Sequence, residues 1–292
     1  MNQDLSHKKV IIVADGAFPT HAEPLRLLRE AGFVVCCDGA AASLTGYGIE
    51  PGIIIGDLDS LTNELAERYS DRLLPDPDQE TNDLTKAVYW CIRHKATDLT
   101  ILGATGKRED HTLGNISLLA SYGKLNSQSV AQADNHEKPG TNDNNPPATP
   151  ADNHGKPETT YYNPSAAPSL NFPAATPARR SGNQEISQNK NNPANPFLNP
   201  AQSAITVKMV TDTGILFPIY GTCTIKTFPG QPVSIFSLDS AAEVTSSGLK
   251  YPLNKVILSS WWIATLNIAT GTSFTLTLSP APLIIYLGHP QP

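Results

Sequence analysis

The sequence predicts an α/β fold with a mostly parallel sheet in its N-terminal part and an antiparallel β-sandwich or barrel in its C-terminal part. Up to residue 123, short continuous apolar runs alternate with segments of helical periodicity, as in βα units. From residue 205, strand-like runs follow one another, separated by Gly, Pro and Asp-Thr turns. A segment of different composition lies between them. We therefore predict an α/β domain at 1–123, an insertion at 124–204 and a β-domain at 205–292.

The N-terminal elements can be assigned in order along the chain. Each of the first three apolar runs ends at an aspartate next to a glycine, which is typical of a strand that leads into a turn. Gly32 favours the end of the first helix. The predicted strands are 10–13, 33–37, 53–55 and 99–102, and the predicted helices are 21–31, 40–44, 81–94 and 113–122.

Residues 124–204 are dominated by Asn, Pro, Ala, Ser and Thr, and contain a degenerate repeat, ADNHEKP at 133–139 and ADNHGKP at 151–157. Such a composition buries too little apolar surface to offset the entropy of ordering the chain. We predict a disordered or loosely held insertion. His136 and His154 of the repeat could suggest metal binding, but drift within a low-complexity repeat explains them better.

The C-terminal part is predicted to be all β. Several of its runs alternate polar and apolar residues, as expected for strands with one face on a core. Together they suggest a small sandwich or flattened barrel. The predicted strands are 205–210, 215–219, 222–228, 233–238, 255–257, 274–278 and 283–287.

Charge and cysteine usage limit the classes of partner. The net charge of −6 disfavours a nucleic-acid backbone as the main partner. Cys36 and Cys37 are adjacent within an apolar run, which favours buried thiols over disulfides. The polar N-terminus lacks the apolar region of a signal peptide, and no stretch reaches the length of a membrane span. We expect a cytoplasmic protein that binds neither nucleic acid nor membranes.

Acidic residues follow the predicted parallel strands. Asp15, Asp38 and the pair Asp57 and Asp59 stand directly after the first three strands. Singly, each could be a turn or helix-cap residue. Ligands of open α/β sheets bind beyond the carboxyl ends of the strands, so we expect these side chains to converge there. Asp57 and Asp59 would point the same way in an extended segment. Clustered carboxylates that also face phosphates suit Mg²⁺.

Two further segments add charge near this edge. Asp83 and Lys86 are three residues apart and so share one face of the predicted helix. They could serve a metal ion and a phosphate, or form a simple surface salt bridge. The glycine-rich loop that begins at Gly103 carries Lys107 and Arg108, but its spacing is not that of a P-loop. No GxGxxG is present, which disfavours a dinucleotide-dependent redox enzyme.

Four motifs in this order resemble the bacterial form of thiamine pyrophosphokinase. They are CDGA (37–40), GDLDS (56–60), QETNDLTKA (79–87) and GATGKREDHTLGN (103–115). GLKYPL (248–253) and ATLN (264–267) extend the resemblance more loosely into the β-domain. The family transfers the diphosphate of ATP to the hydroxyl of thiamine, with Mg²⁺, and works as a homodimer whose substrate sites lie at the subunit interface.

The resemblance implies roles for individual residues. Asp57, Asp59 and Asp83 would be catalytic acids that hold the metal, with Asp38 close by. Lys86 and Arg108 would bind the transferring phosphates. The thiamine side would be lined by Gln79, Thr81 and Asp110, with His111 orienting the loop, and from the β-domain by Tyr251, Thr265 and Asn267.

The β-domain departs from the family at two of these positions. Tyr251 stands where the family usually has tryptophan, and it can still cover the thiazolium cation. The family's Ser-Asn pair is Leu266-Asn267 here, and Thr265 can supply the missing hydroxyl. Trp261 and Trp262 are alternative stacking residues, although we expect one of them to pack in the core.

Two other functions stay open on the sequence alone. A different Mg²⁺-dependent enzyme, such as a pterin diphosphokinase or a nucleotidyl transferase, could use the same acidic edge. A non-enzymatic module that binds ligands through its β-domain would also fit the C-terminal part, but it has no need of carboxylates gathered on one sheet edge.

Overall fold

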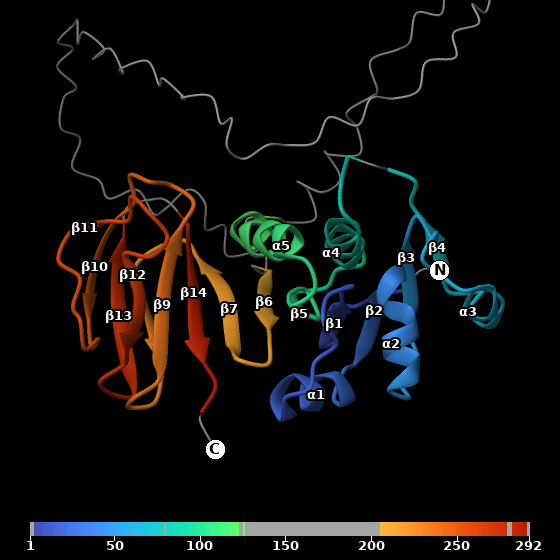
Figure 1. The fold of residues 1–292 in the computed structure, drawn as a ribbon, viewed down its shortest axis with the longest axis horizontal. Helices are drawn as coiled ribbons and strands as arrows, with labels where there is room; N and C mark the ends of the chain where they lie inside the picture. Colours follow the sequence, from blue (N-terminus) through green and yellow to red (C-terminus); the bar gives the residue numbers. More distant parts are fainter. Residues whose placement is uncertain (1–2, 79, 123–124, 126–204, 279–281, 291–292) are drawn as a thin grey trace, which may run out of the picture. The chain divides into compact units, whose positions relative to one another are not determined.

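The computed structural model describes residues 3–78, 80–122, 125, 205–278 and 282–290. Its N-terminal part alternates strands with helices, as predicted, and its C-terminal part contains strands (Figure 1). In chain order the N-terminal elements are β1 (Val10–Val13), α1 (Ala22–Arg29), β2 (Phe33–Cys37), the 3-10 helix η1 (Asp38–Ala40), α2 (Ala41–Gly46), β3 (Ile53–Gly56), α3 (Asn63–Arg68), β4 (Leu73–Pro75), α4 (Asp83–Arg93), β5 (Asp98–Leu102) and α5 (Glu109–Tyr122). The C-terminal strands are β6 (Thr206–Val210), β7 (Gly214–Ile219), β8 (Cys223–Lys226), β9 (Pro232–Ser237), β10 (Glu243–Ser247), β11 (Val256–Ile257), β12 (Ala264–Ile268), β13 (Ser273–Leu278) and β14 (Leu283–Gly288).

A single ten-stranded sheet runs through both parts, in the order β12-β9-β14-β7-β6-β5-β1-β2-β3-β4. Neighbouring strands from β6 to β4 pair in parallel, and those from β6 to β12 pair antiparallel. The mostly parallel N-terminal sheet and the antiparallel C-terminal strands are therefore confirmed. Their continuity is new, because β6 adds to β5 in parallel before the sheet changes direction. The residues of the predicted insertion from 126 to 204 lie outside the described part, and the domain boundaries stay a prediction.

The parallel strands are apolar because both of their faces are covered. Alternate residues of β1 belong to different core clusters: Val10 and Ile12 pack with residues of α4 and α5, whereas Ile11 and Val13 pack with residues of α1 and α2. β2 and β3 alternate in the same way. A strand buried on both faces reads as a continuous apolar run, which is why these strands could be found in the sequence.

The C-terminal strands form a sandwich. β11, β10, β13 and β8 make a second, four-stranded sheet. Val244 and Phe274 of this sheet share a core cluster with Val233 and Ile285 of the large sheet, and all four are almost fully buried. The two sheets therefore enclose a second hydrophobic core.

Several element boundaries differ from the prediction. α5 begins at Glu109 and not at residue 113, so His111 lies within a helix. Glu109 and Asp110 stabilise the first turn through the helix dipole, a contribution that the apolar pattern does not contain. α3, β4, β10 and β12 were not predicted. Each of them either is short or carries too few apolar residues to produce a clear period.

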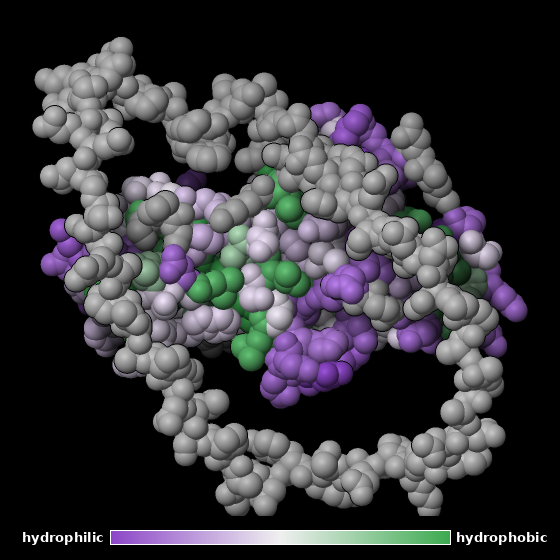
Figure 2. Space-filling model, turned by 90° about the horizontal axis from the view of Figure 1, so that it is seen from above, coloured by the Kyte–Doolittle hydropathy of each residue, from purple (hydrophilic) through white to green (hydrophobic). Residues whose placement is uncertain are grey.

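The surface of the described part is mixed. In the view of Figure 2, hydrophobic groups gather over the middle and hydrophilic groups mostly to the right. Leu113 on α5 and Tyr220 after β7 are among the large apolar side chains that are exposed. Of the helices that the structure describes, none has both the length and the apolar character needed to cross a bilayer.

Candidate active site

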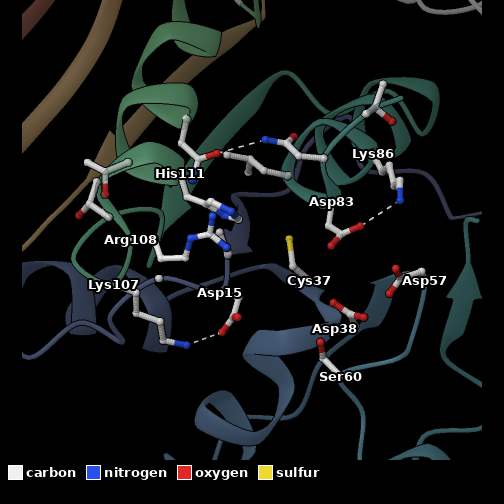
Figure 3. A pocket seen from close by; sticks show the side chains of 18 of the residues that line it. Asp15, Cys37, Asp38, Asp57, Ser60, Asp83, Lys86, Lys107, Arg108 and His111 are labelled. Atoms are coloured by element: carbon white, nitrogen blue, oxygen red, sulfur yellow. Dashed lines mark hydrogen bonds and ion pairs between the residues drawn. The ribbon is translucent and has the colours of Figure 1, made fainter. Parts of the chain in front are cut away.

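A cavity of about 440 Å³ lies where the parallel strands end. Its walls come from the segments that follow β1, β2, β3, β4 and β5, and from the N-terminal turns of α4 and α5 (Figure 3). This is the edge at which we expected the acidic residues to converge. The lining residues are Ala14, Asp15, Gly16, Cys37, Asp38, Asp57, Ser60, Asp78, Thr81, Asn82, Asp83, Leu84, Lys86, Thr105, Lys107, Arg108, His111, Thr112 and Asn115.

Three carboxylates form a cluster on one side of the cavity. Asp38, Asp57 and Asp59 each have an oxygen atom within 4.8 Å of the others. We expected Asp57 and Asp59 to point the same way because the segment between them would be extended. The segment is not extended, so this explanation is wrong. β3 ends at Gly56, and Leu58 adopts the left-handed region with φ 67°. The resulting turn is closed by the Asp59 N–H, which donates to Asp57 Oδ1 at 3.3 Å.

Asp38 is the buried member of the cluster, with 5% of its surface exposed. Its carboxylate accepts hydrogen bonds from the main-chain N–H of Gly39 (2.6 Å) and of Leu58 (3.0 Å). Burial, with the negative charges of Asp83 and Asp57, raises the pKa of Asp38 against the opposing effect of these hydrogen bonds. The cluster therefore concentrates negative charge that a divalent cation would neutralise.

Asp83 and Lys86 form an ion pair at the start of α4. Lys86 Nζ lies 3.0 Å from Asp83 Oδ1 and also donates to the main-chain oxygen of Asp76 at 3.0 Å. The Lys86 side chain is only 4% exposed. Burial alone would lower the pKa of Lys86, but the hydrogen bond and charge of Asp83, with the charges of Asp76 and Asp57, raise it. Lys86 is therefore a positively charged group fixed in the cavity wall.

The loop between β5 and α5 brings basic groups to the opposite side. Lys107 Nζ pairs with Asp15 Oδ1 at 2.6 Å. The Arg108 guanidinium pairs with the Asp110 carboxylate, and this pairing, with the His111 N–H, lowers the pKa of Asp110 to about 2. Figure 3 shows Lys107 and Arg108 across the cavity from Asp57 and Lys86. The space between them is bordered by cations on two sides and by carboxylates on a third.

Cys37 also faces the cavity (Figure 3). Burial raises the pKa of its thiol well above the usual value. A thiol of this kind stays protonated near neutral pH and is a poor nucleophile. The arrangement therefore favours charge stabilisation over covalent catalysis by cysteine.

Most of the predicted site residues of the α/β part line this cavity: Asp38, Asp57, Thr81, Asp83, Lys86, Arg108 and His111. Asp59 belongs to the carboxylate cluster although it is not a lining residue. Asp83 is not a member of that cluster, whose third carboxylate is Asp38. Asp110 is exposed and held by Arg108. Gln79 lies outside the described residues.

The three predicted residues of the β-domain lie elsewhere in the chain. Thr265 and Asn267 belong to β12, at the opposite edge of the sheet from β4. The Asn267 side chain is buried, accepts the Tyr251 N–H (3.0 Å) and donates to the Tyr251 carbonyl (2.7 Å). It therefore braces the turn that presents the Tyr251 ring, which is 57% exposed. The Thr265 hydroxyl donates to the Trp262 carbonyl.

Our expectation that Trp261 or Trp262 packs in the core is wrong. Trp261 is 38% exposed and meets Phe236 edge-on, and Trp262 is 76% exposed. Tyr251 and Leu266, which is 86% exposed, are further large apolar side chains of the β-domain that are exposed. The strand β12 is bulged between Ala264 and Asn267, and Leu266 adopts φ 57°, so the period-two pattern that would have indicated outward side chains is broken.

Sequence reasoning missed two lining residues that hold the walls together. Asn82 caps α4 by accepting the Thr85 N–H at 2.9 Å, and its amide donates to Asn115 Oδ1 at 3.2 Å. An asparagine directly before a helical segment is a recognisable capping signal. Asn115, within α5, had no such signal, because its role depends on the approach of two helices.

Two family models match the chain. The model described as "Thiamin pyrophosphokinase, catalytic domain" matches residues 25–131, and the one described as "Thiamin pyrophosphokinase, substrate-binding domain" matches residues 214–286. The first match falls on most of the described N-terminal part, without β1, and the second on most of the C-terminal part.

Named proteins and a solved structure are similar as well. The chain is 30% identical over 105 residues to thiamin pyrophosphokinase 1 of Caenorhabditis elegans, covering 33% of this chain and 43% of that protein. It is 34% identical over 94 residues to thiamine pyrophosphokinase of Bacillus subtilis, covering 30% of this chain and 44% of that protein. The chain thus spans less than half the length of these relatives. The crystal structure of the Bacillus subtilis protein aligns over 97% of this chain and 100% of its own, with a TM-score of 0.59 at 17% identity, which shows a shared fold.

Proposed function

The chain belongs to the thiamin pyrophosphokinase family, and we propose that it transfers the diphosphate group of ATP to the hydroxyl of thiamine, giving thiamine diphosphate and AMP. The observation that supports this most strongly is the cavity itself. It combines a carboxylate cluster, a buried and charged lysine, and a basic loop around one space. That set suits a polyphosphate bound together with a divalent cation.

Mg²⁺ is the cation that these residues fit. The donors are carboxylate oxygens from Asp38, Asp57 and Asp59, three hard ligands that leave room for water and for phosphate oxygens. Asp83 could reach the same ion or one bound to the nucleotide, and its role as a ligand stays a prediction. The ion would neutralise charge on the phosphates and help to orient them.

The chain's own cations would hold the remaining phosphate charge. Lys86 is fixed by Asp83 and by the Asp76 carbonyl, so it needs no rearrangement to face an anion. When phosphate binds, Arg108 would either give up its ion pair with Asp110 or bind Asp110 and the phosphate together. The thiamine hydroxyl oxygen attacks the β-phosphorus, the bond from this phosphorus to the α-phosphate oxygen breaks, and AMP departs. A carboxylate among Asp57, Asp59 and Asp83 is the candidate acceptor of the hydroxyl proton.

The thiamine side would be built from two subunits. Gln79, Thr81, Asp110 and His111 are our candidates in the α/β part. Tyr251, Thr265 and Asn267 are too far along the sheet to join them within one chain, since four strands separate β12 from β5. A homodimer in which the partner supplies these groups resolves this. The exposure of three large apolar side chains, those of Tyr251, Trp262 and Leu266, supports such a contact.

We also propose that the protein works in the cytoplasm. Cys36, Cys37 and Cys91 are buried free thiols, and Cys223 is free as well. Unpaired cysteines are typical of a reducing compartment.

A product assay tests the function. The purified protein is incubated with ATP and Mg²⁺, and with thiamine, with a pterin alcohol, or with neither. We expect AMP and thiamine diphosphate in equal amounts, and only when thiamine is present. AMP release only with the pterin would favour the pterin diphosphokinase, and no nucleotide turnover in any mixture would contradict the proposal.

A further inference from the structure

Two polar contacts join α4 and its N-cap to α5, one part-buried and one buried. Near the cavity, the Asn82 amide donates to Asn115 Oδ1 at 3.2 Å. Farther along both helices, the hydroxyls of Thr85 and Tyr122 lie 2.7 Å apart. Asn115, Thr85 and Tyr122 are each at most 9% exposed. The first contact joins two amides and includes the exposed Asn82, whereas the second joins two buried hydroxyls, and the two also differ in what else they touch.

Only the contact near the cavity reaches the loop between β5 and α5. The Asn115 amide donates to the carbonyl oxygen of Ala104 at 2.9 Å. Its carbonyl and amide groups are therefore both occupied, one by α4 and one by the loop. Because α4 and the loop have no covalent link nearby, Asn115 connects two separate walls of the cavity.

These walls carry the cations that would face each other across the substrate. Asn82 stands directly before Asp83 and one helical turn before Lys86. Ala104 stands a few residues before Lys107 and Arg108, on the same loop. A shift of Asn115 would therefore change the separation of Lys86 and Arg108, which Figure 3 shows on opposite sides of the cavity.

We propose that Asn115 and Asn82 form an amide bridge that sets the distance between the two groups of phosphate-binding cations. Asn115 is a positioning residue, because it acts through Lys86 and Arg108. The effect of this bridge on turnover rests on the proposed function. Its effect on the cavity walls does not depend on which reaction the cavity performs.

The variants separate the bridge from the capping and packing roles of the same residues. Asn82→Ser keeps an N-cap oxygen for α4 but removes the amide that reaches Asn115. Asn115→Leu removes both side-chain hydrogen bonds of Asn115, the one from Asn82 and the one to Ala104. Tyr122→Phe breaks the other contact between the same two helices. Gln231→Leu is the matched control for Asn115→Leu, since Gln231 is also a buried amide that donates to a carbonyl, that of Gly288 at 2.9 Å.

Steady-state kinetics give the first readout. We expect Asn82→Ser and Asn115→Leu to lower kcat per folded molecule by roughly 10- to 100-fold, with a change in the KM for ATP of less than about threefold, because misplaced groups weaken the transition state more than the ground state. Tyr122→Phe and Gln231→Leu should lower the melting temperature and leave kcat within about twofold. Equal kcat in all four variants would overturn the proposal, and if Asn115→Leu does not fold, Asn82→Ser decides alone.

Amide hydrogen exchange of the ligand-free protein gives a readout that needs no reaction. Asn82→Ser should speed exchange in residues 104–112 more than Tyr122→Phe does. If the wild type makes no AMP, the proposed function is wrong. The comparison of exchange rates between the two variants still tests whether the amide bridge holds the loop. Equal exchange of that loop in both variants would overturn it.

Discussion

Single residues decide where the carboxylates of the cavity point. Asp38 is held by the N–H groups of Gly39 and Leu58, so its position depends on the backbone that leaves β3. Gly56 ends this strand and packs directly against Asp38. A Cβ atom at position 56 would lie 2.6 Å from Asp38 Cγ, well inside van der Waals contact. The absence of a side chain at Gly56 is therefore what allows Asp38 to join Asp57 and Asp59.

Gly56→Ala should displace Asp38 and disrupt the cluster. We expect a loss of stability of roughly 1–3 kcal/mol, as for overpacking, and a fall in AMP formation of at least about tenfold. Thermal unfolding and the AMP assay measure the two effects. Gly46→Ala is the control, because a Cβ there meets nothing within 4 Å. Unchanged activity in Gly56→Ala would mean that Asp38 does not need its observed position.

The sequence predicted the acids of this site better than their arrangement. The spacing of Asp57 and Asp59 indicated a shared direction, and the two do lie together, but through a turn at Leu58 that the spacing does not reveal. Asp38 takes the third place in the cluster because β2 and β3 are neighbours in register. Asn115 could not be recognised, since its partners come from two other segments of the chain.

The loop between β1 and α1 links the cavity to the C-terminal strands. It carries Asp15 and Gly16 in the cavity wall. At its far end, the Asp212 carboxylate in the turn between β6 and β7 accepts the N–H groups of Thr20 and His21, each at 3.0 Å, and the Thr20 hydroxyl. The His21 ring also stacks on His289, with centroids 4.6 Å apart. At the cavity end the Ala17 N–H donates to the Thr105 carbonyl at 2.7 Å, so the loop is anchored at both ends.

The Asp212 anchor should make stability depend on pH. Burial alone would raise the pKa of Asp212, but the hydrogen bonds from Thr20 and His21 outweigh it and lower the pKa. The folded state then favours the carboxylate, so the contribution is present above the unfolded pKa of about 3.9 and is lost as pH falls through the folded value.

Urea unfolding of Asp212→Asn tests this. We expect the variant to be less stable than the wild type by about 1 kcal/mol at pH 7, and the difference to shrink as the pH falls below about 4. Asp71→Asn is the control, because the Asp71 side chain is 75% exposed and its ion pair with the neighbouring Arg72 is long, at 3.9 Å. A difference that does not change with pH would show that the Asp212 charge is not what holds the loop.

Predictability from sequence varied among the elements. β1, β2, β3 and β5 were found because burial on both faces makes them uniformly apolar. The start of α5 was missed because its first turn is set by charge and not by apolar spacing. The partner of β6 could not be predicted, since nothing in its five residues indicates that it pairs in parallel with β5.

At the scale of the whole molecule, one sheet carries both halves of the proposed site. The cavity lies at the parallel strands, whereas β12, whose Asn267 is hydrogen-bonded to Tyr251, is the edge strand at the antiparallel end of the sheet. A continuous sheet fixes these halves apart within a chain, which is why the proposal requires a second subunit.

Sedimentation should therefore give a particle of twice the chain mass of 31.3 kDa. Replacing both Trp262 and Leu266 by lysine should shift the protein toward monomer and lower activity with it, because charges would be buried in the contact. Tyr47→Lys alters an exposed aromatic residue of the N-terminal part and should leave the dimer intact. An active monomeric wild type would contradict the shared site.

The segment between the two parts should be dispensable for catalysis. The family models match residues 25–131 and 214–286, largely on either side of it. Replacing residues 128–200 by a Gly/Ser linker should leave kcat within about twofold of the full chain. The same product assay measures this, and a large loss of kcat would show that the segment takes part in the site.

In the proposed mechanism, carboxylates from separate loops hold a divalent ion that carries the phosphates of ATP. Asp57→Asn tests it most directly, by AMP formation with Mg²⁺, ATP and thiamine, alongside thermal unfolding with and without Mg²⁺. We predict that AMP formation falls by at least about 100-fold. The melting temperature in the absence of Mg²⁺ should be unchanged or higher, because repulsion with Asp38 is relieved. Mg²⁺ should no longer raise the melting temperature of the variant. Full AMP formation by a folded Asp57→Asn protein would show that the carboxylate cluster does not hold the catalytic ion.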